Sequence, residues 1–433
     1  MQTCKKSPHL FSTTKCILYG TSLVPCFVLC GAISFSPFSA EAIKGEAHAR
    51  SHVTQDYLYV PNGRDGSISQ YSINLDGTLK KLPNFTVVAG KGGTTLTVTT
   101  DKKHAYLVND DDNTISQYAI SPAGQLLPLK PPTIGVGKGA VRGLVISPSG
   151  KSAYVDNLED NSISQYNLQA NGLLTALTPP SVPTGAAPLN IFLDATGKYA
   201  YTTNAKGKSI NEFKVNPDGS LAPLSPALVA TNGQARSLVF DSTGRYAYVA
   251  NSPPDSISQF SVSLDGIFSL LVPASVPSDD NTGDIIKRSP FTSSVYIAND
   301  HSISQYRITS TGNLAPLSPV EVPTGASASP ISFNPKKHFA YVGNFESNTI
   351  SQYRIETTGN LVALSPSQVP TGRGPETVAC DSSGNFAYVV NNEEATISQF
   401  RIAKVGTLTP LSPATVKSGG GAYFITVVRI GSR

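Results

Sequence analysis

A tyrosine followed three residues later by an asparagine recurs along almost the whole chain, at spacings of about 45 to 48 residues. After each asparagine, a short polar loop leads to Ser/Thr-Ile-Ser-Gln-Tyr/Phe, with a variant at 209–213. The eight tyrosines are Tyr59, Tyr106, Tyr154, Tyr201, Tyr248, Tyr296, Tyr341 and Tyr388. A fixed period of this length is typical of one repeat architecture rather than of several unrelated domains.

One repeat unit contains four candidate strands joined by turns. Apolar and β-branched stretches at 237–240, 246–250 and 256–262 alternate with turns such as Asp-Ser-Thr-Gly, and a fourth strand follows the next turn. A lone four-stranded sheet cannot cover both of its faces, so repeated sheets pack against one another around a ring. The sequence therefore predicts an all-β fold, a β-propeller with eight four-stranded antiparallel blades, and seven blades as the second choice.

The two ends of the repeat array complement each other. The first unit begins at Tyr57 with its second strand, whereas the chain ends with an extra apolar strand at 423–428. If this last strand completes the first blade, the array exposes no unpaired sheet edge at the junction. We therefore expect the C-terminal strand to close the ring.

The most regular residues of the repeat are expected to hold the fold together. Side chains alternate between the two faces of a strand, and neighbouring blades cover both faces, so the recurring Ile and Tyr are predicted to fill the core. The recurring Gln is predicted to be a buried amide with partners, and the recurring Asn to bond to backbone groups of its turn. A ring of asparagines that binds a ligand is the alternative.

The N-terminal segment differs from the repeat region. Three lysines precede an uncharged stretch at 16–40, and small residues follow where a signal peptidase would cut. We predict a signal peptide at 1–42, a linker at 43–56 and the propeller at 57–433, in a protein exported to the periplasm or the extracellular space. Because the apolar stretch is long enough to span a bilayer, an uncleaved anchor is the alternative.

Cysteine usage agrees with a fold held by its own core. Four of the five cysteines lie in the N-terminal segment, which leaves Cys380 alone in the predicted propeller. No disulfide framework is therefore expected there. Cys380 stands at an apolar strand position, where we expect an inert buried thiol.

Charge and motifs argue against several classes of function. Charged residues make up 14% of the chain, the net charge is +4 and the basic residues are scattered, unlike a nucleic-acid surface. The acidic run at 110–112 lacks the spacing of a calcium loop, and the glycine-rich run at 135–139 lacks the Ser/Thr and the helix of a phosphate loop. No nucleophile elbow or paired-cysteine zinc motif follows the leader. We predict no metal and no cofactor.

The repeat itself is similar to a known family. Its Ala-Tyr-Val-x-Asn step, its Ser/Thr-Ile-Ser-Gln-Tyr strand and its Ser-Thr-Gly-Arg turns resemble the lactonase-like β-propellers. These include bacterial 6-phosphogluconolactonases and fungal carboxymuconate cyclases, and they border on the YVTN-repeat propellers of microbial surfaces. The resemblance covers nearly all of residues 57–430. It implies a propeller that usually has seven blades, where this chain has eight copies.

The resemblance also implies a site of His, Arg and Glu side chains at the mouth of the channel. Such residues lie in loops that enter the first strand or leave the second strand of a blade, and both loop sets share one end of the ring. The candidate catalytic residues at matching positions are Arg142, Arg236, Glu159, Glu346 and His301. The candidate ligand-binding residues are Arg373, Glu376 and Asp284.

Two functions stay open at the level of sequence. One is an exported scaffold that binds a protein, a glycan or a small anionic ligand at one propeller face, with no nucleic acid and no membrane contact beyond an uncleaved N-terminal segment. The other is a lactonase acting on an anionic sugar acid or lactone. Because packing alone explains residues that recur in every copy, we expect function to lie in loops where the copies disagree.

Overall fold

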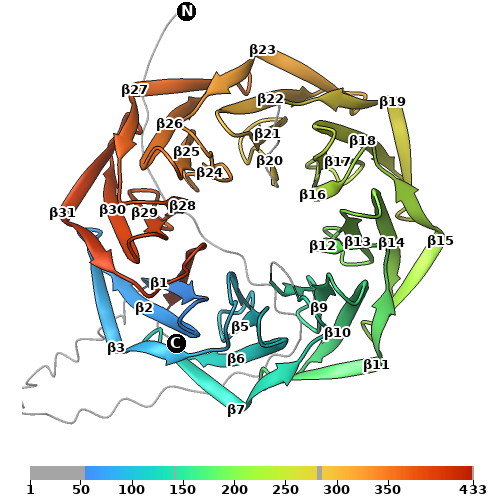
Figure 1. Ribbon diagram of the computed structural model, residues 1–433, viewed down its shortest axis with the longest axis horizontal. Helices are drawn as coiled ribbons and strands as arrows, with labels where there is room; N and C mark the ends of the chain where they lie inside the picture. Colours follow the sequence, from blue (N-terminus) through green and yellow to red (C-terminus); the bar gives the residue numbers. More distant parts are fainter. Residues whose placement is uncertain (1–53, 141–142, 280–284, 432–433) are drawn as a thin grey trace, which may run out of the picture. The chain divides into compact units, whose positions relative to one another are not determined.

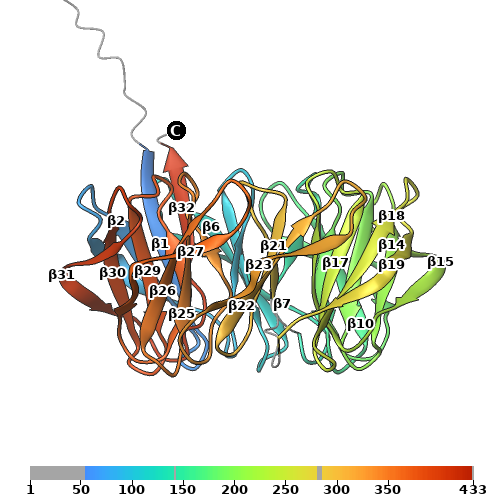
Figure 2. The same cartoon turned by 90° about the horizontal axis from the view of Figure 1, so that it is seen from above.

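The computed structural model describes residues 54–140, 143–279 and 285–431, which belong to one compact unit, His52–Arg433. The described residues contain no α-helix and form eight four-stranded antiparallel sheets. Figure 1 shows these sheets as blades around a ring, and Figure 2 shows the ring from the side. The fold is an eight-bladed β-propeller, as the repeat predicted.

Each blade consists of an inner, a second, a third and an outer strand, and the blades are numbered 1 to 8 in the order of their second strands along the chain. From blade 1 to blade 8, the inner strands are β32 (Thr426–Gly431), β4 (Leu96–Val98), β8 (Val145–Ile146), β12 (Pro188–Leu193), β16 (Ala235–Phe240), β20 (Ile286–Arg288), β24 (Ser332–Phe333) and β28 (Pro375–Cys380). The second strands are β1 (Thr54–Asn62), β5 (His104–Asn109), β9 (Ser152–Asn157), β13 (Tyr199–Asn204), β17 (Tyr246–Asn251), β21 (Ser294–Ala298), β25 (Phe339–Asn344) and β29 (Phe386–Asn391).

The other two strands of each blade lie farther from the centre of the ring (Figure 1). The third strands are β2 (Ser67–Ile73), β6 (Thr114–Ile120), β10 (Ser162–Leu168), β14 (Ser209–Val215), β18 (Ser256–Val262), β22 (Ser302–Ile308), β26 (Thr349–Ile355) and β30 (Thr396–Ile402). The outer strands are β3 (Leu79–Val88), β7 (Leu126–Gly135), β11 (Leu174–Pro183), β15 (Leu221–Ala230), β19 (Phe268–Pro277), β23 (Leu314–Pro323), β27 (Leu361–Pro370) and β31 (Leu408–Lys417).

The C-terminal strand closes the ring, as expected. Strand β1 pairs with β2 on one side and with β32 on the other, with Tyr57 opposite Val428. The closing strand runs over Thr426–Gly431, three residues later than the sequence predicted, and β1 begins at Thr54, three residues earlier. The predicted signal peptide at 1–42 lies outside the described residues.

Hydrophobic contacts join each blade to the next. The core between blades 4 and 5 packs Tyr201 and Ile210 of one blade against Leu238, Val249 and Phe260 of the other, and all five side chains are buried. The recurring Ile and Tyr or Phe of the third strands therefore fill the space between blades, as predicted. Burial of apolar surface at these interfaces is the main stabilisation of such a ring.

The recurring tyrosine and glutamine add hydrogen bonds between blades. The hydroxyl of Tyr248 donates to the carbonyl oxygen of Gly312 in the next blade, at 2.7 Å. Gln259 accepts from the backbone NH of Leu314 in the next blade, at 2.6 Å, and donates to Pro273 in its own outer strand, at 2.9 Å. The glutamine is thus a buried structural amide.

The recurring asparagine has side-chain partners that the sequence did not predict. Asn157 is fully buried, and its Nδ2 donates to the hydroxyls of Ser162 and Ser164, both at 2.9 Å. The hydroxyls belong to the third strand, so the asparagine ties the second strand to the third strand across their loop. The expected bond to the backbone is found in Asn251, whose Nδ2 also donates to the Ser256 carbonyl oxygen at 3.3 Å, but the two hydroxyls of the Ser/Thr-Ile-Ser pattern were not foreseen as partners.

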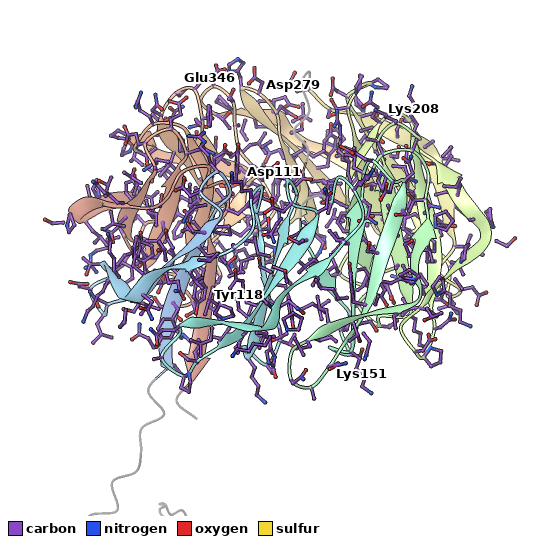
Figure 3. All side chains as sticks on the ribbon, turned by 60° about the horizontal axis from the view of Figure 1, so that its bottom comes forward. Asp111, Tyr118, Lys151, Lys208, Asp279 and Glu346 are labelled. Atoms are coloured by element: carbon purple, nitrogen blue, oxygen red, sulfur yellow. The ribbon has the colours of Figure 1, made fainter. Side chains whose placement is uncertain are left out.

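The two ends of the ring are built from different loops. The mouth end carries the loops that enter the inner strands and those that leave the second strands. The base end carries the turns between inner and second strands and those between third and outer strands. Figure 3 shows Asp111, Lys208, Asp279 and Glu346 at the mouth end and Lys151 at the base end.

Two further expectations concern the thiol and the membrane. Cys380 is a free, partly buried cysteine of β28, and burial together with the neighbouring Asp381 raises the pKa of its thiol to about 12. A thiol with such a pKa is a poor nucleophile at neutral pH.

No helix within the described ranges is long and apolar enough to cross a bilayer.

Candidate functional site

The residue near the start of the inner strand, at the mouth end of the ring, differs in chemical type from blade to blade. In blades 5 and 8, the ladder between inner and second strands shifts register around Arg236 and Glu376, which hold corresponding positions in their blades. A β-bulge takes a residue out of the regular pairing and re-aims its side chain. Packing therefore constrains the type of residue at this position of the inner strand less than at the neighbouring positions.

An open pocket of about 700 Å³ lies at the mouth end across blades 6, 7 and 8. Asp300 comes from the loop after β21, Glu346 from the loop after β25, and Glu376 from β28. Figure 3 shows Glu346 at this end of the ring. The rest of the described lining is Asn299, Ser327, Ala328, Ser329, Pro330 and Phe345. We call it the acidic pocket, because its described lining has three carboxyl groups and no Lys or Arg.

A close approach between blades 7 and 8 fixes the backbone that carries Glu376. A Cβ atom on Gly343 would lie 2.5 Å from the Glu376 carbonyl oxygen, so glycine alone leaves room there. Ser329 donates its backbone NH to Gly343 at 2.8 Å and its hydroxyl to the Pro375 carbonyl oxygen at 3.4 Å. Glu376 is therefore presented from a rigid strand and not from a loose loop.

Burial changes the acidity of this residue. It raises the pKa of the half-buried Glu376 to about 7. No described residue forms a hydrogen bond or ion pair with this carboxyl group. A carboxyl group with such a pKa populates both protonation states at neutral pH, which suits it to accept and return a proton.

The candidate histidine lies beside the acidic pocket. Its Nε2 is 3.2 Å from the Asp300 carboxylate, and 68% of its side chain is exposed. Asp300 also accepts a hydrogen bond from the backbone NH of Ser327, at 3.1 Å. His301 therefore touches the pocket wall through Asp300.

The other predicted residues that the structure describes do not line this pocket. Arg236 lies in blade 5, where its Nε donates to the Ser252 carbonyl oxygen at 3.1 Å. Glu159 is exposed in blade 3, and Arg373 pairs with Glu394 at 3.3 Å. The structure thus brings Glu346 and Glu376 into one pocket, whereas the described arginines Arg236 and Arg373 lie elsewhere. Two candidates lie outside the described residues, Arg142 and Asp284.

Sequence reasoning missed a second carboxyl group with unusual acidity, Asp156. It lies in β9 directly before the recurring asparagine, is 2% exposed and accepts a hydrogen bond from the Thr202 hydroxyl at 3.2 Å. Burial raises its pKa to about 7. A comparison of the repeat copies could have found Asp156, because the residues at the corresponding position of two other copies, Ala250 and Val390, are apolar.

The geometry bears on both chemistry and cofactors. A carboxyl group of pKa about 7 that shares a pocket with two other carboxyl groups can move a proton, and carboxylates accept hydrogen bonds from the hydroxyls of a polyol. Within the described ranges, no group of three His, Cys, Asp or Glu side chains is arranged to hold a metal ion.

Comparison with known proteins places the chain in a family. The family model described as "Lactonase, 7-bladed beta-propeller" matches residues 44–233 and 219–424. The chain belongs to this lactonase family. The two matched stretches overlap and run from β1 to β31 of this lactonase-family propeller, which has eight blades where the family description has seven. No curated protein matches the chain.

Solved structures resemble this lactonase-family propeller in fold. A 6-phosphogluconolactonase candidate from Bacteroides fragilis is 17% identical, with a TM-score of 0.58 over 86% of this chain and 98% of that one. The periplasmic gluconolactonase PpgL of Pseudomonas aeruginosa is 16% identical, with a TM-score of 0.57 over 87% and 100%. AztD of Citrobacter koseri is 14% identical, with a TM-score of 0.60 over 88% and 99%. At these identities the likeness concerns the fold alone.

Proposed function

We propose that this propeller hydrolyses the lactone of a sugar acid in the acidic pocket. The observation that carries the proposal is Glu376, an unpaired carboxyl group with a pKa of about 7, on the wall of a pocket at the mouth end of a lactonase-family propeller. Two of the similar structures bear lactonase names, which agrees with this reaction.

The reaction needs one group that takes a proton from water and returns it. The Glu376 carboxylate removes a proton from water as the water oxygen attacks the lactone carbonyl carbon. The tetrahedral intermediate then collapses, the ring C–O bond breaks, and the leaving oxygen takes the proton from the Glu376 carboxylic acid. The product is the open-chain hydroxy acid, and Glu376 is again ionised.

The charge of the pocket indicates which lactone fits. Asp300 and Glu346 accept hydrogen bonds from sugar hydroxyls, whereas they repel a phosphate or carboxylate group. We therefore favour an uncharged aldonolactone over the anionic substrate that an arginine-lined mouth would bind. Glu346 and Asp300 orient the substrate, and Glu376 is the catalytic residue.

The proposal is tested by lactone hydrolysis with the purified propeller. Wild type is expected to open glucono-1,5-lactone above the spontaneous rate, and faster than its 6-phosphate ester. Glu376→Gln removes the general base and is expected to lower kcat by about 100-fold or more. Glu159→Gln, which changes an exposed mouth carboxylate outside the pocket, is the matched control and is expected to keep wild-type turnover.

Absence of turnover with every lactone would favour the competing function, binding without catalysis at the mouth end. We further propose export to the periplasm or the cell exterior, on the strength of the leader-like segment at 1–42. Fractionation of cells that express the full chain tests this, since retention of the full-length protein in the cytoplasm contradicts export.

A further inference from the structure

A second pocket, of about 750 Å³, lies at the base end between blades 3 and 4. Its walls come from the turns between inner and second strands of both blades and from the turn at 216–219 of blade 4. Lys151, which lines it, is at the base end in Figure 3, whereas Glu346 is at the mouth end. This pocket is therefore separate from the acidic pocket.

The blade interface at this pocket lacks a ring that most of the other interfaces carry. In six of the eight interfaces, the residue five positions before the recurring asparagine of the second strand places an aromatic or imidazole ring over a turn glycine of the next blade. These pairs are Tyr57 with Gly124, His104 with Gly172, Tyr199 with Gly266, Tyr246 with Gly312, Phe339 with Gly406, and Phe386 with Gly77. Between blades 3 and 4, Ser152 takes this place over Gly219. A hydroxymethyl group in place of a ring leaves space unfilled.

The other serine interface shows how such a space is otherwise closed. Ser294 of blade 6 lies over Gly359, but there Phe291 stacks on His338 of blade 7, with ring centroids 4.4 Å apart. The residues that correspond to Phe291 and His338 at the pocket are Ser149 and Lys198, and both line it. Blades 3 and 4 thus lack both kinds of ring.

Three lysines surround the space that results. Lys151, Lys198 and Lys214 line the pocket, and none of their ammonium groups forms a hydrogen bond or an ion pair with a described residue. The carboxylate in the lining, Asp218, already accepts two hydrogen bonds from Ser220, at 2.9 and 2.7 Å. Three positive charges and one negative charge leave a net charge of +2. We call this site the lysine pocket.

We propose that the lysine pocket binds a small organic phosphate monoester. A phosphate monoester carries a charge of about −1.5 to −2 at pH 7, which balances the net charge of the pocket. The volume lies within the range of about 300 to 1,000 Å³ that is usual for small-molecule sites. Ser152 and the Asn167 amide add neutral hydrogen-bonding groups for the rest of the ligand. The site does not depend on lactone hydrolysis.

Calorimetric titration with glycerol 3-phosphate, inorganic phosphate and glycerol tests the proposal. Wild type is expected to bind glycerol 3-phosphate, to bind inorganic phosphate more weakly, and not to bind glycerol. Lys198→Gln is expected to weaken the binding of glycerol 3-phosphate by about tenfold at low salt. Arg245→Gln, at the corresponding turn position of blade 5, is the matched control and is expected to leave binding unchanged, because Tyr199 over Gly266 fills the interface between blades 4 and 5.

Filling the space gives a test that does not remove a charge. Ser152→Phe inserts the kind of ring that six interfaces carry, so the variant is expected to keep or raise the wild-type Tm and to lose glycerol 3-phosphate binding. Unchanged affinity in a folded Ser152→Phe variant overturns the proposal. So does a wild-type protein that binds no phosphate, or equal weakening by Arg245→Gln and Lys198→Gln. Lactone hydrolysis is expected to be unaffected in these lysine-pocket variants, which separates this test from that of the acidic pocket.

Discussion

The hydroxyl of Tyr388 in blade 8 donates a hydrogen bond to the carbonyl oxygen of Gly77 in blade 1, at 2.7 Å, across the junction where the ring closes. The backbone NH of Leu79 in blade 1 likewise donates to Gln399 of blade 8, at 2.6 Å. The same two bonds join neighbouring blades elsewhere, so the junction between the chain ends has the contacts of an uninterrupted interface.

Removal of one such tyrosine hydroxyl is expected to lower the free energy of unfolding by the same amount at the junction as at an interface within the array. Tyr388→Phe leaves the Gly77 carbonyl oxygen without its buried donor, and Tyr248→Phe does the same to Gly312. Each variant is expected to lose about 1 to 2 kcal/mol of unfolding free energy, measured by urea denaturation. A loss several times larger for Tyr388→Phe would mean that the junction carries the stability of the ring.

The closing strand is also held by an ion pair. The carboxylate of Asp56 in β1 accepts hydrogen bonds from Arg429 of β32, from Nε at 2.8 Å and from Nη2 at 3.0 Å. It also accepts one from the Ser382 hydroxyl of blade 8, at 2.7 Å. Burial opposes ionisation of Asp56, but the hydrogen bonds from Arg429 and Ser382 outweigh it and hold the pKa of this carboxyl below its usual 3.8. The ionised form is therefore more stable in the folded protein than in the unfolded chain.

From this depressed pKa we expect Asp56→Asn to lower the free energy of unfolding at pH 7 by about 1 to 3 kcal/mol. The contribution of the carboxylate is present above pH 3.8 and is lost as the pH falls through the lower folded-state pKa, so the difference from wild type is expected to shrink in acid. Thermal unfolding at a series of pH values measures this. The same substitution at the fully exposed Asp76 is the control, and an equal loss in both variants contradicts the role of the ion pair.

The blade count and closure could be predicted because they follow from recurrence. Every copy uses the same Tyr, Asn, Ile and Gln, or a close variant of them, for packing, so the periodicity of Tyr59 to Tyr388 predicts the number of blades. Partners of these residues were harder to predict, since the register between strands decides that Asn157 meets two hydroxyls.

The site could be predicted only in part, because it depends on which blades are neighbours. Glu346 and Glu376 were candidates from their loops and do share a pocket, but Asp300 joins them only because blade 6 lies beside blade 7. The pKa of Glu376 depends on how deeply the folded ring buries its carboxyl group, which no spacing in the sequence reveals. The lysine pocket could be found only by looking for the copy in which a recurring ring is replaced by a small side chain, Ser152.

One copy carries an acid in place of the recurring glutamine. Glu212 is fully buried, and its Oε1 accepts the backbone NH of Phe268 at 2.7 Å, as the glutamines do for their own partners. Its Oε2 has no partner among the described residues, whereas the glutamine Nε2 at this position donates to the outer strand. Burial raises the pKa of Glu212 to about 7. A protonated carboxyl group supplies the donor that the glutamine amide supplies elsewhere.

Glu212→Gln is therefore expected to stabilise the propeller at pH 8 and to change little at pH 4. In the wild type, the folded-state pKa of about 7 exceeds the unfolded value of 4.5, so stability is complete below pH 4.5 and is lost as the pH rises from there to about 7. The gain at pH 8 is expected to be about 1 to 3 kcal/mol, measured by urea denaturation. The reverse exchange, Gln165→Glu in blade 3, is expected to destabilise at pH 8 only. Effects of both exchanges that do not change with pH would contradict this interpretation.

The pH dependence of lactone opening gives a second measure of the role of Glu376. If its carboxylate is the general base, kcat/KM for glucono-1,5-lactone is expected to rise with pH and to level off above about 7, because burial has raised the pKa of that carboxyl to this value. A pH-stat records the enzymatic rate after subtraction of spontaneous hydrolysis. Glu346→Gln is expected to raise KM several-fold and to keep the rise near pH 7, since Glu346 orients the substrate and takes no proton. A rate that does not change between pH 5 and 8, with activity retained in Glu376→Gln, would assign the chemistry to another group at the mouth end.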